Sequence, residues 1–291
     1  MNDTATPDAP EDLSQWSKVI TPQRGWLDVR WRDLWHYRDL IYMFVRRDFV
    51  GTYKQTVLGP LWFFLQPLFT TIVFTIVFGR IAKISTDSIP APLFYLSGVV
   101  MWQYFADCLN KTSGTFTGNA ELFGKVYFPR LAVPLSVVIT SLLAFAIQLT
   151  LFLCFFVYFK LHGAPIHLSY RVMVLPVLVV QMAALGLGVG CLVSALTTRY
   201  RDLAVAVGFG VQLWMYASAV VYPLSSIPPE WRWLLVLNPM VPIIEAFRFA
   251  FLGSGVVEIW QLAVGAGVSL VVLLGGVLIF NHVEKTFSDT A

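Results

Sequence analysis

The chain has 291 residues, of which 57% are hydrophobic and only 13% are charged. Soluble domains carry about 25% charged residues, so this composition excludes an ordinary soluble protein and indicates an all-α integral membrane protein. The 20 Lys and Arg residues nearly balance the 17 Asp and Glu residues, which leaves no basic surface for a nucleic-acid partner.

Residues 1–30 lack periodic apolar positions, and we expect them to form a mobile cytoplasmic tail. In residues 31–54, aromatic and aliphatic residues recur at near-helical spacing, with charged residues between them. This pattern predicts an amphipathic interfacial helix, with its aromatic face in the lipid headgroups and its arginines toward lipid phosphate. A helix that packs on a soluble partner is the alternative. We assign the interfacial contact to Trp31, Trp35, Arg38, Arg46 and Arg47.

Six uncharged runs follow, and each is roughly long enough for the ~20 residues that cross a bilayer as a helix. They cover residues 55–79, 88–106, 131–159, 172–198, 203–229 and 259–283. We therefore predict a six-span transmembrane domain over 55–283 and a cytoplasmic C-terminal tail over 284–291. In the fourth run, Gly186 and Gly190 favour close helix packing, either within the chain or in a dimer.

Between the fifth and sixth runs, the uncharged segment from Trp233 to Ile244 has 12 residues. As a helix it would reach about 18 Å, short of the roughly 30 Å hydrocarbon core. Asn238, Pro239 and Pro242 interrupt it, so we predict a re-entrant helical hairpin whose backbone is satisfied by protein or by a water-filled cavity. A loop on the bilayer surface is the alternative.

Basic residues predict the orientation, because Lys and Arg concentrate on the cytoplasmic side of membrane proteins. If the N-terminus is cytoplasmic, most of the 20 Lys and Arg residues lie inside. The outer side then holds Arg80, Lys83, Lys160, Arg171, Arg232 and Arg248. We therefore expect both termini to lie in the cytoplasm.

The sequence offers no evident energy source of its own. The middles of the six runs contain no ionisable residue that would couple transport to an ion gradient. The string from Gly118 to Gly124-Lys125 has five residues between its glycines, where a phosphate-binding loop has four, and Val126 replaces the required hydroxyl. ATP must therefore bind a separate subunit, and we predict no cofactor or metal in this chain.

No acid, base and nucleophile converge in the sequence, so we predict no catalytic residues. Two alternatives stay open. One is a membrane-embedded glycan-modifying enzyme that uses His162, Glu230 or Glu245 as an acid or base. The other is a passive channel.

Two predicted cytoplasmic loops are suited to receive a separate ATPase. The longer runs from Lys111 to Arg130 and contains a short helical stretch over 119–126, capped by Asn119. The shorter covers 197–202 and is compact and charged. Both loops would also serve as simple basic anchors, which is the alternative.

Several short strings stand in a distinctive order along this topology. They are Arg38-Asp39-Leu40, Arg47-Asp48-Phe49, the segment 53–62 with Gln66-Pro67, the segment 125–130, the segment 199–202, Asn238-Pro239 and Phe247-Arg248. Together they resemble the permease subunits of type-two ABC exporters of bacterial polysaccharides. The similarity is greatest to Wzm-like O-antigen exporters, with teichoic-acid and capsule exporters as near relatives, and it covers nearly everything after residue 30.

The resemblance implies a homodimer in the bacterial cytoplasmic (inner) membrane, with two copies of an ATPase subunit that bind ATP and magnesium. The substrate would be a lipid-linked, O-antigen-like polysaccharide. The inside loops would act as coupling helices, and the outer hairpin would close the exit. The implied ATPase contacts are Glu121, Lys125, Tyr127, Arg130, Arg199 and Asp202. The implied residues of the outer gate are Asn238, Pro239, Pro242, Glu245 and Arg248.

Aromatic residues make up 15% of the chain, and several lie deep in the predicted spans. Aromatic faces and uncharged polar side chains suit a neutral route along which a sugar chain can slide. Our candidates for the channel lining are Phe69, Gln148, Gln181, Gln212, Trp214 and Tyr216. Rings that pack in the core or face lipid are the alternative.

Overall fold

The computed structural model describes residues 31–54, 56–126, 128–200, 202–255 and 257–288, which form helices and loops without strands. The predicted tail over 1–30 lies outside these residues. The elements are α1 (Trp31–His36), α2 (Arg38–Tyr53), η2 (Gly59–Leu61), α3 (Trp62–Phe74), η3 (Thr75–Ile81), α4 (Ala91–Ser113), α5 (Thr115–Gly118), α6 (Ala120–Lys125), α7 (Ala132–Leu161), η4 (Tyr170–Val174), α8 (Leu175–Thr197), α9 (Leu203–Tyr216), η5 (Leu224–Ser226), α10 (Pro229–Val236), α11 (Met240–Leu252) and α12 (Ile259–Ser288). The all-helical prediction is confirmed for this part of the chain.

Four helical segments of the described chain are long and apolar enough to cross a membrane, and they match four of the six predicted runs. They are Gly59–Ile81, Ala132–Leu161, Tyr170–Thr197 and Ile259–Glu284. The pair α10 and α11 would be a fifth if its two helices, bent by 105°, are counted as one span. α12 itself continues to Ser288, into the stretch that we assigned to the C-terminal tail.

The remaining two runs differ from the prediction. The fifth run, 203–229, is not one helix, because α9 ends at Tyr216 after 14 residues. The second run overlaps α4, which has 23 residues, continues to Ser113 and carries polar groups such as Gln103 and Asp107. α4 packs against α8, α7, α3 and α11, and nearly all its side chains from Leu93 to Ala106 are buried. Because protein surrounds it, α4 needs fewer apolar residues than a helix that faces lipid.

Glycines let α8 approach its neighbours on two sides. A Cβ atom on Gly276 of α12 would lie 2.2 Å from the carbonyl oxygen of Gly188 in α8, so these backbones touch. On the other side of α8, Cβ atoms on Gly186 and Gly190 would lie 2.7 Å from Cys108 and 2.6 Å from Thr112 of α4. The small-residue pair of the fourth run therefore packs within the chain.

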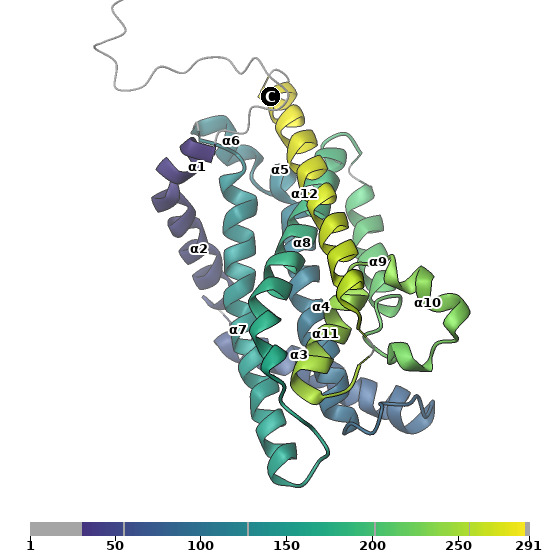
Figure 1. The fold of residues 1–291 in the computed structure, drawn as a ribbon. Coiled ribbons are helices and arrows are strands. Elements are labelled where there is room, and N and C mark those ends of the chain that lie inside the picture. Colours follow the sequence, from purple (N-terminus) through teal and green to yellow (C-terminus); the bar gives the residue numbers. More distant parts are fainter. Residues whose placement is uncertain (1–30, 55, 127, 201, 256, 289–291) are drawn as a thin grey trace, which may run out of the picture.

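The N-terminal helices pack only part of their predicted apolar face on the protein. α2 packs along α7 (Figure 1), and Leu34, Phe44 and Val45 are buried. Trp35 and Tyr42, expected on the same apolar face as Leu34 and Val45, are 73% and 69% exposed. Periodicity located the helix but did not indicate which side packs on α7.

The two ends of the bundle bring together different loops. In Figure 1, α1, α6 and the C-terminal end of α12 lie at one end, and the loop that follows α7 lies at the other. At the first end, Thr197 Oγ1 donates to the carbonyl of Ser113 at 3.4 Å, which joins the two loops predicted to be cytoplasmic. We call this the α6 end.

Candidate functional site

The α5–α6 loop is held from beneath by aromatic rings. Phe116 stacks on Phe280 of α12 with centroids 4.5 Å apart, and Phe128 lies 5.7 Å from Phe123 and 5.6 Å from Phe44 of α2. These rings form one buried cluster that joins the loop to the first and last described helices. These contacts fix the loop to the bundle, and its outer face takes no part in this aromatic packing.

Charged residues of α6 occupy that outer face. Glu121 and Lys125 form an ion pair at 3.9 Å, with 94% and 77% of their side chains exposed. Such an exposed pair contributes little to stability. Asn119 occupies the predicted N-cap position of α6 but makes no side-chain capping bond; its Nδ2 instead donates to the carbonyl of Thr115 at 3.0 Å. The reason is that Asn119 also ends α5, and its side chain satisfies a carbonyl of that helix.

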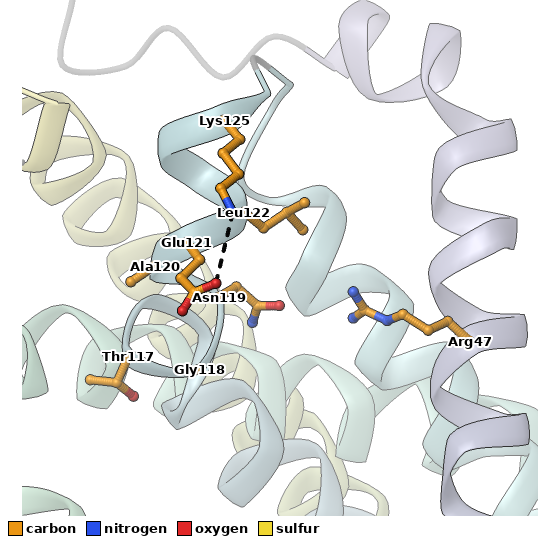
Figure 2. A pocket seen from close by; sticks show the side chains of 8 residues that line it. All are labelled: Arg47, Thr117, Gly118, Asn119, Ala120, Glu121, Leu122 and Lys125. Carbon is orange, nitrogen blue, oxygen red and sulfur yellow. Dashed lines mark ion pairs between the residues drawn. The ribbon is translucent and has the colours of Figure 1, made fainter. Parts of the chain in front are cut away.

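An open pocket of about 560 Å³ lies between α2 and the α5–α6 loop. Figure 2 shows Arg47 extending from α2 toward this loop, with Glu121 and Lys125 on the far side. The pocket thus brings together residues from two surfaces that the sequence predicts separately, the interfacial helix and the ATPase contact. Arg47 is held by Asp48 at 2.8 Å and lies 4.8 Å from the Phe44 ring centroid. Arg38 and Arg46 are exposed on the same helix.

The other predicted ATPase contacts fall into three groups. Arg130 is half-buried and ties the loop to α12, donating to the carbonyl of Glu284 at 3.0 Å with its guanidinium 5.2 Å from the Phe123 ring centroid. Arg199 and Asp202 are exposed at the same end of the bundle. Tyr127 and the side chain of Trp31 lie outside the described residues.

The predicted outer gate is a helix pair bent by 105° between α10 and α11. Asn238 sits at the bend, where its Nδ2 donates to the carbonyl of Ala217 at 3.1 Å and to Ser218 Oγ at 2.9 Å. Its Oδ1 accepts from the Met240 amide at 3.1 Å. Pro239 and Pro242 are buried. One amide side chain thus joins the end of α9 to the start of α11.

Arg248 and Glu245 of α11 form a buried ion pair at 3.3 Å, each with 1% of its side chain exposed. Arg248 Nη1 donates to the carbonyl of Ala219 at 2.8 Å, and Nη2 donates to that of Val220 at 2.8 Å. Glu245 and Arg248 stand three residues apart, a spacing that favours an intrahelical ion pair. The two carbonyls come from the segment after α9, and no local pattern predicts them.

The α4 side of the Arg248 pocket is also specific. Arg248 Nε donates to Ser97 Oγ at 3.2 Å, and the guanidinium carbon lies 3.7 Å from the Phe94 ring centroid. A Cβ atom on Gly98 would lie 2.9 Å from Arg248 Nη2 and from the Val220 carbonyl oxygen. Ser97-Gly98 within an apolar run is the sequence signal for this close approach.

The candidate channel residues divide by exposure. Gln148 and Gln181 are 3% and 7% exposed, and Trp214 packs edge-on against Phe105 with centroids 5.0 Å apart. Phe69 and Tyr216 are 56% and 42% exposed, and Gln212 is exposed as well. The structure therefore places the first three inside the chain and the last three on its surface.

The candidate acid–base residues occupy different environments. His162 is exposed at the end of α7, with Nδ1 2.8 Å from the Tyr158 carbonyl oxygen. Glu230 is exposed on α10, and Glu245 is buried against Arg248. Cys108, Cys154 and Cys191 are not disulfide-bonded, and no cluster of three or more potential metal ligands occurs in the described part of the chain.

The described chain is thus a bundle of helices, four of them long and apolar enough to cross a membrane, with a charged loop at one end. A family model described as ABC-2 type transporter matches residues 39–252. The chain belongs to this family.

Named relatives cover most of the chain. It is 30% identical to the O-antigen export system permease protein RfbA of Myxococcus xanthus over 263 residues. This alignment covers 89% of this chain and 98% of the relative. It is 26% identical over 252 residues to the protein of the same name from Klebsiella pneumoniae, covering 86% and 94% of the two chains. The polysialic acid transport protein KpsM of Escherichia coli is 23% identical over 237 residues, covering 78% and 87%.

Proposed function

We propose that this chain is the membrane-spanning subunit of an exporter that moves a lipid-linked, O-antigen-like polysaccharide across the bacterial inner membrane. The observation that carries the proposal is the family match together with relatives named as O-antigen and polysialic acid transport proteins. A separate nucleotide-binding subunit supplies the energy and binds ATP and magnesium. The active unit is a homodimer with two copies of that subunit.

The ATPase docks at the α6 end. This assignment is supported by the exposed, charged α6, which lies on a loop that aromatic rings fix to the bundle. A loop held in this way transmits a movement of the ATPase to the spans better than a mobile loop would. Glu121, Lys125, Arg199 and Asp202 form the contact, and the pocket beside Arg47 admits a side chain of the partner. Arg130 acts indirectly, by holding the loop on α12.

The membrane arrangement has six spans, with both termini in the cytoplasm. α4 is one of them, because its 23 residues span about 34 Å as a helix. α9 and the segment after it form the fifth, and α10 and α11 form a re-entrant hairpin on the outer side. Non-helical backbone is tolerated at membrane depth where protein satisfies it, and Arg248 and Asn238 do so for the carbonyls of residues 217, 219 and 220.

Labelling of single cysteines tests the two unusual spans. In a background in which the exposed Cys154 is replaced by Ser, we expect Ser85→Cys and Glu230→Cys to react with a membrane-impermeant maleimide in intact spheroplasts. Glu121→Cys and Asp202→Cys should react only after permeabilisation. Positions 85 and 121 lie on either side of α4, and positions 202 and 230 lie on either side of α9 and the segment after it. Equal labelling of both positions around a span would refute that span.

The substrate route runs along the dimer axis. The exposed candidates Phe69, Gln212 and Tyr216 line it, together with the exposed face of α9, whose Val205 and Phe209 are 80% and 65% exposed. Gln148 and Gln181 stay inside the protomer in this state. A neutral surface of this kind holds no fixed charge that would trap a moving sugar chain.

Variants of α6 test the docking site. Glu121→Lys should lower recovery of the co-expressed ATPase with the full-length permease by about tenfold, as for a central interface residue. The fold should not suffer, because the pair is highly exposed. Recovery is measured by affinity purification and immunoblotting.

The exchange Glu121→Lys with Lys125→Glu is the matched control for helix stability, since it keeps an ion pair and reverses the charge pattern. We expect it to lose the ATPase as well. Lys160→Glu, an exposed change at the opposite end, should recover the ATPase normally. Normal recovery with Glu121→Lys would exclude α6 as the docking site.

A further inference from the structure

A second pocket, of about 620 Å³, lies at the end of the bundle opposite α6. It is formed where η4 leads into α8, beside α11 and the start of α12. The far ends of α8 and α12 carry Thr197 and Glu284, which contact the loops of the α6 end. In the proposed arrangement this pocket therefore opens at the outer membrane–water interface.

Arg171 is held in this pocket by ring contacts. Its guanidinium carbon lies 4.5 Å from the Phe249 ring centroid and 5.9 Å from that of Tyr170. Its backbone is fixed as well, because Ser169 caps η4 and the Ser169 amide donates to the carbonyl of Ala250 at 2.9 Å. No ion pair or side-chain hydrogen bond of this guanidinium occurs with any described residue, so its N–H groups are available to an anion.

Glu258 supplies the opposite charge on another wall of the pocket. Its Oε2 accepts a hydrogen bond from Trp260 Nε1, and this fixes the carboxylate beside the ring. The two charges are not ion-paired with each other, so the pocket presents a cation and an anion separately. The remaining wall is apolar, with Val174, Val257 and Leu262.

We propose that this pocket binds the headgroup of phosphatidylethanolamine from the outer leaflet. The phosphate meets Arg171, the ammonium group meets Glu258, and an acyl chain lies on the apolar wall. Tyr170 and Trp260 are 81% and 54% exposed, and aromatic residues of these two types favour the headgroup region. A zwitterionic headgroup matches these two separate charges, whereas an anionic lipid meets the Glu258 carboxylate without an ammonium group. This inference rests on the membrane arrangement and not on which substrate is exported.

Native mass spectrometry of the full-length chain tests the proposal. Dioleoyl phosphatidylethanolamine should bind about fivefold more tightly than dioleoyl phosphatidylglycerol, as for one exposed ion pair. Arg171→Gln should weaken both lipids, and Arg171→Lys should restore part of the loss because it keeps the charge without the forked geometry. Glu258→Gln should abolish the preference while leaving phosphatidylglycerol bound.

Lys160→Gln, which removes an exposed cation at the same end outside the pocket, is the matched control and should change neither affinity. Three results would overturn the proposal: no preference in the unmodified chain, unchanged binding with Arg171→Gln, or an equal loss with Lys160→Gln. Displacement of the lipid by a soluble oligosaccharide would also overturn it, because it would assign the pocket to sugar. Export and ATPase recovery can remain normal in each of these cases, so failure here is distinct from failure of the proposed function.

Discussion

Replacing Arg248 with Met should lower the free energy of unfolding by about 3–5 kcal/mol, the range for removing one partner of a buried ion pair. The change takes the cation from Glu245 and the donors from the carbonyls of Ala219 and Val220. It also leaves the face of Phe94 without its guanidinium. The thermal unfolding midpoint in detergent measures the loss.

Arg232→Met is a close control for this change. Arg232 also donates to two backbone carbonyls, which precede α10: those of Ile227 at 2.8 Å and Ser225 at 2.9 Å. It is only half-buried and has no carboxylate partner in the described structure. We therefore expect Arg232→Met to lower the free energy of unfolding by about 1–2 kcal/mol. Equal losses of stability for the two variants would show that the buried ion pair of Arg248 contributes nothing beyond hydrogen bonds to backbone carbonyls.

Replacing Gly276 with Ala should force α8 and α12 apart, because the new methyl group would lie 2.2 Å from the Gly188 carbonyl oxygen. Overpacking of this kind costs about 1–3 kcal/mol or more. A backbone atom cannot rotate away as a side chain would, so the upper part of that range applies. Unfolding midpoints and the yield of folded protein measure the effect.

The neighbouring Gly275 is the control, since a Cβ atom there meets nothing within 4 Å. Gly275→Ala should leave stability unchanged or raise it by up to about 1 kcal/mol through helix propensity. If both alanine variants behave alike, the close contact of α8 and α12 is not real.

Hydrophobic runs predicted the positions of the long helices well, because a helix that crosses lipid must be apolar along its length. They failed at the end of α9. The segment 217–222 contains no Gly or Pro, and Ala219 adopts a positive φ of 55°. This break is stabilised by Arg248 and Asn238, which lie 29 and 21 residues away from the carbonyls that they contact. The residues beside the break give no sequence signal for these distant hydrogen-bond donors.

The candidate site was predictable where contacts are local. The spacing of Glu245 and Arg248 indicated an intrahelical pair, and the segment after Asn119 indicated a short helix. The contact of Arg130 with Glu284 spans 154 residues and had no sequence signal. The side of α2 that packs on α7 was also hidden, because lipid and protein interiors are equally apolar and periodicity does not distinguish them.

The central claim is that this chain forms the conduit and that a separate ATPase drives it. Transport of a fluorescent lipid-linked glycan into proteoliposomes is the most direct measurement. The account predicts transport only when the partner ATPase, ATP and magnesium are all present, and none with this chain alone under nucleotide or a proton gradient. ATP hydrolysis or uphill transport by the purified chain alone would contradict it.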